Sequence, residues 1–175
     1  MTHIRALEQS DRLALTRFLQ RVPAGESRFF KEDVLDARTV TSWLEEPRAP
    51  RAVACDDSGD ILGYAVVLPG KGWSSHVGEL GLVVDPQHRR AGLGRLLAQW
   101  ALVESARMGL AKLSVEVVAE QDAAVRMFQQ LGFRAEALLY DHVRDRDGLT
   151  RDLIVLSHQV AENWSLLETI GLGSS

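Results

Sequence analysis

The sequence predicts a mixed α+β fold, and two observations support this prediction. Some segments are short runs rich in β-branched and other apolar residues, whereas others carry apolar residues at helical spacing. These segments follow one another as strand, helices, three strands, helix, strand, helix and two strands. With 175 residues, the chain fits one domain around one sizeable core. We expect that domain over residues 1–160 and a C-terminal helical extension or tail over residues 161–175.

The N-terminal part begins with a short strand expected at Ile4–Leu7. A helix follows, for which Ser10 is the expected N-cap and Pro23 marks the end. A second helix is expected over Asp36–Glu46, with its first residue as the cap. The apolar residues expected to face the core are Leu13, Leu15, Phe18 and Leu19 in the first helix and Val40, Trp43 and Leu44 in the second.

A β-hairpin is expected in the middle of the chain. Two apolar runs, Arg51–Cys55 and Ile61–Leu68, flank the turn sequence Asp56–Asp60. Gly59 in this turn can adopt the positive φ angle that such connections need. A further strand is expected at Val77–Val84.

The C-terminal half alternates helices and strands. A long helix is expected over Gly94–Met108, a strand at Leu113–Val118 and a short helix over Asp122–Leu131. Two more strands are expected at Phe133–Arg144 and Arg151–Val160. The apolar stripe of the long helix is expected to consist of Leu96, Leu97, Trp100 and Val103.

Composition excludes several classes of function. The net charge of −4 and the absence of a basic block argue against nucleic acid as a partner. A single cysteine, Cys55, allows no internal disulfide and no thiolate metal site, and His76, His88 and His142 lack a metal-binding spacing. We therefore predict no metal. No apolar run approaches the ~18 residues of a membrane span, and no signal peptide is evident, so we expect a cytoplasmic protein without a membrane partner.

The most informative segment is Val83-Val-Asp-Pro-Gln-His-Arg-Arg-Ala-Gly-Leu-Gly-Arg-Leu-Leu97. An apolar strand ends, a glycine-spaced loop follows, and a helix starts directly after it. Such a connection directs backbone N–H groups and the positive end of a helix dipole at one point. Gly92 and Gly94 leave room for a bulky anion, and Arg89 and Arg90 add positive charge. The alternative is a turn whose glycines serve only packing. We favour a phosphate or pyrophosphate site.

This segment resembles the GNAT superfamily of N-acetyltransferases. Arg89-Arg-Ala-Gly-Leu-Gly94 matches the Gln/Arg-x-x-Gly-x-Gly/Ala signature of that family, with a strand before it and a helix after it. Residues 113–133, which end Met-Phe-Gln-Gln-Leu-Gly-Phe133, resemble the second motif of the family. The resemblance implies a mostly antiparallel central sheet, flanked by helices and splayed between its fourth and fifth strands. It also implies acetyl-CoA as cosubstrate and transfer of the acetyl group to a primary amine.

The resemblance further implies where acetyl-CoA would bind. The backbone amides of the loop residues would bind its pyrophosphate, and the pantetheine arm would pair with the end of the fourth strand. Gln121 stands where the family often has an asparagine and would hydrogen-bond the cosubstrate, and Phe128 stands where many members have a tyrosine. The cosubstrate-binding residues so expected are Leu82, Val83, Val84, Arg89, Arg90, Ala91, Gly92, Leu93, Gly94, Gln121 and Phe128.

Acetyl transfer to an amine requires a general base, because an alkylamine with a pKa near ~10.4 arrives protonated. Glu79 is the candidate, because it lies in an apolar strand at a position where the family often has a base. A solvent-facing glutamate is the alternative for Glu79, and Glu116 on the next expected strand is the reserve base. The oxyanion would be met by a backbone N–H group, that of Val84.

The sequence departs from the family at the position of the expected proton donor. Phe128 has no proton to give to the departing thiolate, so a tyrosine acid at this position is excluded. Tyr140 or water would substitute, or the thiolate would leave unassisted. Tyr140 is therefore named as a catalytic candidate, although a half-buried structural tyrosine is the favoured interpretation.

The acceptor is not determined by these motifs. A small-molecule amine and a protein lysine or N-terminus both fit, and acceptor selection is expected to involve residues 22–36, 69–75 and 144–150. The apolar spacing in residues 160–170 indicates either packing on the same domain or a homodimer contact. Because Phe128 removes the usual acid, a catalytically impaired acetyl-CoA sensor or a protein-interaction module is the second hypothesis. An unrelated nucleotide-phosphate enzyme would need a Walker lysine that the sequence lacks.

Overall fold

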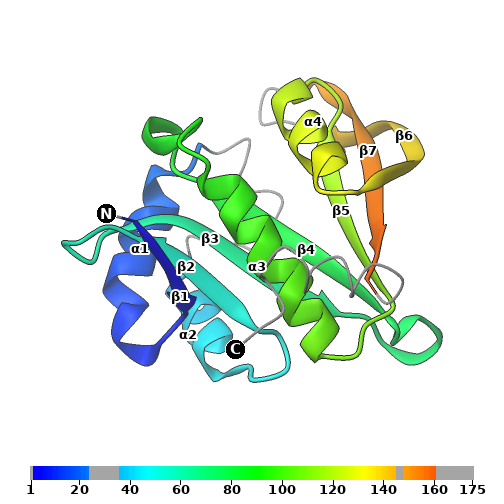
Figure 1. Ribbon diagram of the computed structural model, residues 1–175. Coiled ribbons are helices and arrows are strands. Elements are labelled where there is room, and N and C mark those ends of the chain that lie inside the picture. Colours follow the sequence, from blue (N-terminus) through cyan, green and yellow to red (C-terminus); the bar gives the residue numbers. More distant parts are fainter. Residues whose placement is uncertain (1, 24–35, 145–147, 161–175) are drawn as a thin grey trace. The chain divides into compact units, whose positions relative to one another are not determined.

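The computed structural model describes residues 2–23, 36–144 and 148–160 of the chain (Figure 1). The chain forms two compact units. The first contains residues 1–68 and 81–100, and the second contains residues 69–80 and 101–175. Strand β4 (Val77–Val84) and helix α3 (Leu93–Arg107) contribute residues to both units. The extension expected at residues 161–175 and most of the turn expected at residues 145–148 lie outside the described residues.

The first unit is built on three antiparallel strands. Strand β1 (His3–Ala6) pairs with β2 (Arg51–Cys55), and β2 pairs with β3 (Ile61–Pro69). The expected hairpin between β2 and β3 is confirmed, and Gly59 has a φ angle of 86°. The Asp56 carboxylate accepts hydrogen bonds from three groups of the turn, the Ser58 N–H and hydroxyl and the Asp60 N–H. These bonds fix the turn that sets the register of the hairpin.

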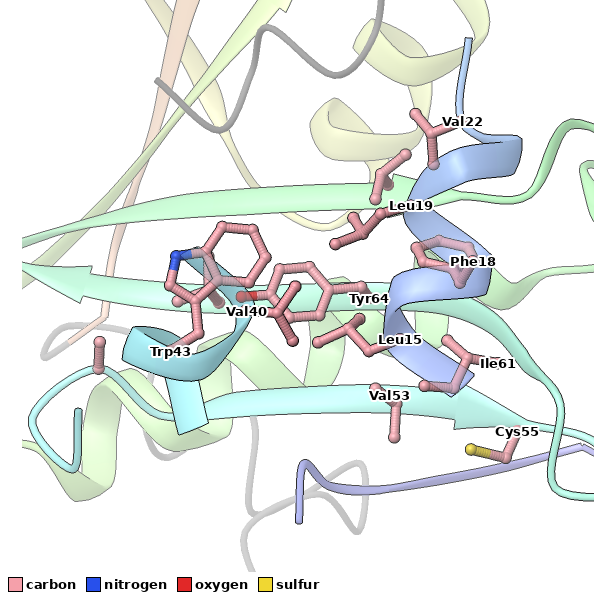
Figure 2. Packing of buried hydrophobic residues seen from close by; sticks show 13 residues of the cluster. Leu15, Phe18, Leu19, Val22, Val40, Trp43, Val53, Cys55, Ile61 and Tyr64 are labelled. Carbon is pink, nitrogen blue, oxygen red and sulfur yellow. The ribbon is translucent and has the colours of Figure 1, made fainter. Parts of the chain in front are cut away.

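Two helices cover one face of this antiparallel sheet. They are α1 (Arg12–Arg21) and α2 (Ala37–Glu45). Their apolar side chains pack on residues of β2 and β3 around Tyr64, which is fully buried (Figure 2). The Trp43 ring stacks on the Tyr64 ring at 5.3 Å, and the Arg51 side chain donates a hydrogen bond to the Tyr64 hydroxyl oxygen. Burial of these large side chains gives the first unit its own hydrophobic core.

The opposite face of β3 packs against the N-terminal part of α3. A Cβ atom at Gly63 would lie 2.9 Å from Leu97 Cδ1, so glycine lets this leucine pack directly on the strand, and any other residue would require the Leu97 side chain to shift. On β4, a Cβ atom at Gly81 would lie 2.9 Å from a Val66 methyl group. Glycines on β3 and β4 therefore permit close packing just before the loop that leads into α3.

The second unit contains the remaining strands. Strand β5 (Lys112–Val118) pairs in parallel with β4, and the register runs from Val77 opposite Lys112 to Leu80 opposite Val115. Strand β7 (Thr150–Gln159) is antiparallel to both β5 and β6 (Arg134–Arg144). Antiparallel pairs thus predominate, and the parallel pair joins the fourth and fifth strands. The predicted mixed α+β class is confirmed.

Helix α4 (Asp122–Gln130) packs on the sheet of the second unit (Figure 1). Its buried Phe128 contacts Phe133 edge to face, with ring centroids 5.1 Å apart. Phe133 in turn lies 5.3 Å from the ring of His158 on β7. These ring contacts join α4 to β7, and they help to bury His158.

Two details of the predicted helices are wrong. Ser10 is not the N-cap of α1, because it lies inside a short 3₁₀ turn, Gln9–Asp11, that precedes the helix. The Asp11 carboxylate accepts a hydrogen bond from Glu8 N–H at 2.9 Å and pairs with Arg5 of β1. The helix therefore starts one residue later than expected, with Asp11 as its N-cap, and Leu13 is 74% exposed.

The predicted apolar stripe of α3 is also rotated from the observed one. Leu97 is buried as expected, but Leu96 is 46% exposed, and Trp100 and Val103 are only half-buried. The buried positions of this helix are Leu93, Leu97, Ala98, Ala101, Leu102 and Ser105. Small residues lie on this face because the helix packs closely on the sheet, as the contact at Gly63 shows.

Candidate active site

The loop between β4 and α3 begins at a buried aspartate. Asp85 follows the last residue of β4, and its N–H donates a hydrogen bond to the Leu62 carbonyl of β3. Its Oδ1 accepts a hydrogen bond from Gln87 N–H at 2.9 Å, which caps the 3₁₀ turn Pro86–His88 (η4). Proline at the first position of the turn has the φ angle that the turn requires. The start of the loop is therefore fixed to the sheet.

The next residues adopt a backbone that leaves the first turn of α3 open. Arg90 and Gly92 both have positive φ angles, 63° and 81°. No atom lies within 4 Å of a Cβ built at Gly92, so the space above this glycine is open. Leu96 N–H donates to the Gly92 carbonyl at 3.1 Å, so the N–H groups ahead of Leu96 belong to the open first turn of α3. Such a turn attracts an anion, and the exposed Arg89 and Arg90 lie beside it.

The strand residues expected at the cosubstrate site lead directly into this loop. Val83 is buried in the core of the first unit, whereas Leu82 and Val84 are half-buried. Alternation along the strand thus keeps Val83 on the core side, while its two neighbours project from the other face of β4. The structure brings Leu82–Val84 and Arg89–Gly94 together within the first unit.

A second anchor of the loop comes from α1. Arg21 Nε donates a hydrogen bond to Asp85 Oδ2 at 2.9 Å, and its Nη2 donates to the Ile61 carbonyl at 2.8 Å. Burial of Asp85 acts to raise the pKa of its carboxyl group. The hydrogen bonds from Gln87 N–H and Arg21 outweigh burial, so the pKa is lowered overall. Asp85 is therefore a buried carboxylate that holds its charge.

Sequence reasoning missed Arg21 and assigned Asp85 only to the end of a strand. An aspartate before a proline after an apolar run is a capping signature, and this signal was available for Asp85. No local signal could have found Arg21, because its partner lies 64 residues further along the chain.

The candidate base, Glu79, lies in the second unit. It stands opposite Ser114 of β5 in the parallel register, and the Ser114 hydroxyl donates to the Gly78 carbonyl at 3.1 Å. Glu79 is half-buried, and its neighbours Gly78 and Leu80 are buried on the opposite face of the strand. The reserve base, Glu116, is two residues beyond Ser114 and hence on the same face of β5. This face of the second unit therefore carries two carboxylates.

The other three expected site residues also belong to the second unit. Gln121 is half-buried and precedes α4, and Phe128 is 3% exposed in the aromatic packing under that helix. Tyr140 on β6 is 75% exposed, so the half-buried structural tyrosine expected from the sequence is wrong. The roles of Glu79, Gln121, Phe128 and Tyr140 stay predictions.

The described residues hold neither a grouped set of metal ligands nor a helix that could span a membrane. Across the described ranges 2–23, 36–144 and 148–160, no three His, Cys, Asp or Glu side chains are grouped as a metal site would need. Within the same part of the chain, no helix is both long enough and apolar enough to span a membrane.

The mixed α+β fold carries a strand, a loop with two positive φ angles and a helix in direct succession, and comparison with known proteins identifies the family. Residues 15–133 match the GNAT acetyltransferase family, so the chain belongs to this family. Membership of the family expected from the sequence is therefore confirmed.

The relatives differ in sequence identity and in the share of each chain that the match covers. A mycothiol acetyltransferase from Kocuria rhizophila is 34% identical over 102 residues, which cover 57% of this chain and 34% of the relative. The chain thus spans about a third of that relative's length. An L-methionine sulfoximine/L-methionine sulfone acetyltransferase from Salmonella typhimurium is 23% identical over 167 residues, which cover 91% of this chain and 95% of the relative.

A solved structure shows the same fold. It is yncA from Salmonella typhimurium, described as a putative acetyltransferase with its cofactor acetyl-CoA. The TM-score is 0.76 at 21% sequence identity, and the likeness covers 91% of this chain and 94% of the other.

Proposed function

We propose that this chain is an acetyl-CoA-dependent N-acetyltransferase that acts on a primary amine. The observation that carries this proposal is the loop at residues 89–94, in which two positive φ angles and the open first turn of α3 occur together. Family membership supports the same activity. The proposal assigns the pyrophosphate of acetyl-CoA to the backbone N–H groups of this loop.

The residues of the loop fit a pyrophosphate group. Gly92 has no neighbouring atom where a side chain would begin, which leaves the backbone accessible to a large anion. Arg89 and Arg90 supply two exposed guanidinium groups, which bind phosphate oxygens well. Asp85 does not oppose this charge directly, because its carboxylate is buried and already accepts bonds from Gln87 N–H and Arg21.

Glu79 is assigned the proton transfer. Acting directly or through a water molecule, its carboxylate accepts a proton from the acceptor ammonium. The neutral amine nitrogen then forms a bond to the thioester carbonyl carbon while the carbon–sulfur bond breaks, and CoA leaves as the thiolate. A thiol of ordinary acidity, with a pKa near ~8.5, is a tolerable leaving group, so the reaction does not require an acid at Phe128.

The acceptor is expected to be cationic before it reacts. Glu79 and Glu116 on one face of the second unit would attract an ammonium group, which supports an amine over a neutral acceptor. A small amine and a protein lysine or N-terminus remain the two candidate acceptors. The match to the L-methionine sulfoximine/L-methionine sulfone acetyltransferase covers 91% of this chain. The name of that relative refers to small amino-acid analogues, which favours testing small acceptors first. Sedimentation would distinguish the two roles left open for residues 160–170, which are packing on the same domain and a homodimer contact.

Two measurements test the proposal. Calorimetric titration with CoA tests binding, and release of CoA thiol from acetyl-CoA tests transfer to a panel of amines. The panel contains amino acids, polyamines, a lysine peptide and a peptide with a free N-terminal alanine. We expect CoA to bind and at least one amine to release thiol. Binding without release on any amine would favour the acetyl-CoA sensor instead.

A matched pair of glycine substitutions assigns the binding site. Gly92→Val should weaken CoA binding at least tenfold, because the side chain would fill the space above the loop. Gly59→Val is the control, since Gly59 also has a positive φ angle and open space around its Cβ but lies in the β2–β3 turn. Both substitutions impose similar backbone strain, so equal losses of CoA affinity would contradict the loop assignment.

A further inference from the structure

Leu96 is an exposed apolar residue in the first turn of α3. Its N–H donates to the Gly92 carbonyl at 3.1 Å, which holds its backbone against the loop assigned to the pyrophosphate. Helical spacing predicted a core position for this leucine, yet it is 46% exposed. The side chain therefore lies outside the core and beside the loop.

The side chain of Leu96 faces away from the sheet. The two residues that follow, Leu97 and Ala98, are both buried, and Leu97 packs against Gly63 of β3. With about 100° of rotation per residue, Leu96 lies about 100° from Leu97 and about 160° from Ala98, in opposite directions around the helix. Helical side chains lean toward the helix N-terminus, so Leu96 covers surface over the turn that holds Gly92.

An apolar surface thus adjoins the open turn of the helix. No atom lies within 4 Å of a Cβ built at Gly92, and the neighbouring Arg89 and Arg90 are exposed. One helical turn beyond Leu96, the half-buried Trp100 extends the apolar surface along the same side of α3. Single exposed leucines are ordinary on protein surfaces. Leu96 differs because the groups beside it fit a ligand in which phosphate adjoins a flat apolar ring.

We infer that Leu96 contacts the adenine base of acetyl-CoA and makes the protein prefer CoA thioesters over those of phosphopantetheine alone. This inference rests on the proposed function, which assigns the pyrophosphate to the neighbouring loop. The pyrophosphate joins two arms of the molecule, and the pantetheine arm is assigned to the end of β4 in the sheet. The adenosine arm then leaves the loop on the side of α3 away from the sheet, where Leu96 lies. Contact between an aliphatic side chain and a purine ring buries apolar surface on both and needs no hydrogen bond.

Calorimetric titration with fragments of CoA provides the direct test. CoA carries the adenosine part, whereas 4′-phosphopantetheine keeps the pantetheine arm and one phosphate but lacks the adenosine. Leu96→Ala should bind CoA about tenfold more weakly than the wild type, because the apolar contact with the base is lost. The same variant should bind 4′-phosphopantetheine like the wild type. Adenosine 3′-phosphate 5′-diphosphate, which lacks the pantetheine arm, should show the same loss as CoA.

Two further variants separate contact with the base from an effect on the fold. Leu96→Met keeps a long apolar side chain and should bind CoA within about twofold of the wild type. Leu13→Ala is the matched control, because Leu13 is 74% exposed on α1 of the same unit, and it should leave both affinities unchanged. Alanine is the best helix former, so Leu96→Ala should fold like the wild type, and thermal unfolding checks this.

The outcomes distinguish the inference from the proposed function. Equal losses of affinity for CoA and 4′-phosphopantetheine in Leu96→Ala would overturn the inference, because Leu96 would then support the loop rather than the base. Unchanged CoA affinity in this variant would also overturn it, and a change in its sedimentation would assign the apolar side of α3 to a contact between copies. If Gly92→Val weakens CoA binding while Leu96→Ala does not, the loop assignment stands without the inference. If the wild type binds neither CoA nor 4′-phosphopantetheine, the proposed function itself fails.

Discussion

Arg21 Nε and Asp85 Oδ2 lie 2.9 Å apart and join the end of α1 to the end of β4. Arg21 is partly exposed, with 41% of its side chain accessible, whereas the Asp85 side chain is 4% exposed. The same guanidinium donates to the Ile61 carbonyl. One arginine thus holds the aspartate from which the whole loop at residues 85–92 begins, and the position of this loop depends on the pair.

Breaking the Arg21–Asp85 pair should lower the stability of the protein, because Asp85 is buried. Arg21→Met leaves Asp85 buried without its charged partner, and we expect the free energy of unfolding to fall by about 1–2 kcal/mol, measured by urea denaturation. Because the pKa of Asp85 is lowered in the folded state, its ionised carboxylate contributes to stability above its unfolded-state pKa of about 4. That contribution to stability is lost as the pH falls through the folded-state pKa of Asp85.

An exposed ion pair provides the control for this prediction. Arg38 pairs with Asp36 at 2.7 Å on the surface, and 91% of the Arg38 side chain is accessible. Arg38→Met should change stability less than Arg21→Met, because solvent screens an exposed pair. Equal effects of the two substitutions would show that Asp85 does not depend on its arginine.

The base assignment predicts a loss of turnover without a loss of binding. Glu79→Gln should lower kcat by ~10²–10⁴ and leave CoA affinity unchanged, because a general base acts on the acceptor proton. Wild-type activity should rise with pH as the acceptor amine loses its proton. Glu116→Gln, on the same face of β5, is the matched control. A loss below ~10-fold for Glu79→Gln, or a larger loss for Glu116→Gln, would move the role elsewhere.

Proton donation by an aromatic side chain should not limit turnover, either at Tyr140 or at the position of Phe128. Tyr140→Phe removes only an exposed hydroxyl group, and we expect turnover within a few-fold of wild type. Phe128→Tyr should leave turnover similarly unchanged. Its added hydroxyl enters the packing against Phe133, so it should lower thermal stability. Abolished turnover in Tyr140→Phe with intact CoA affinity would identify Tyr140 as the acid.

His158 predicts acid sensitivity of the second unit. Burial lowers the pKa of His158, and its Nδ1 has no hydrogen-bond partner among the described residues. The unfolded state therefore binds a proton below about pH 6.5 that the folded state resists, so stability is full above this pH and falls as the pH drops below it. The slope reaches at most about 1.4 kcal/mol per pH unit for one proton.

Substitution of His158 should remove this sensitivity. His158→Leu places an apolar side chain without a titrating group beside Phe133. The free energy of unfolding of this variant should vary less between about pH 7 and pH 5 than that of the wild type. Denaturant unfolding at a series of pH values provides the measurement. A pH dependence identical to that of the wild type would assign the acid sensitivity to other groups.

Local patterns in the sequence determined the class of fold, the hairpin at Gly59 and the loop from Arg89 to Gly94. These features depend on residues close together in the chain, since glycine permits a positive φ angle and a helix start exposes its own N–H groups. Short-range spacing therefore carries enough information to predict them. The same spacing indicated the family through Arg89-Arg-Ala-Gly-Leu-Gly94.

Only the tertiary structure decided which side chains hold that loop and which face of α3 is buried. Arg21 reaches Asp85 across 64 residues of sequence, and the backbone N–H of Asp85 is bonded to the Leu62 carbonyl of β3. Likewise, Leu97 packs at Gly63 because two distant segments fold together, and this contact rotates the buried face of the helix away from Leu96. Such contacts depend on the relative placement of elements, which periodicity within one element does not specify.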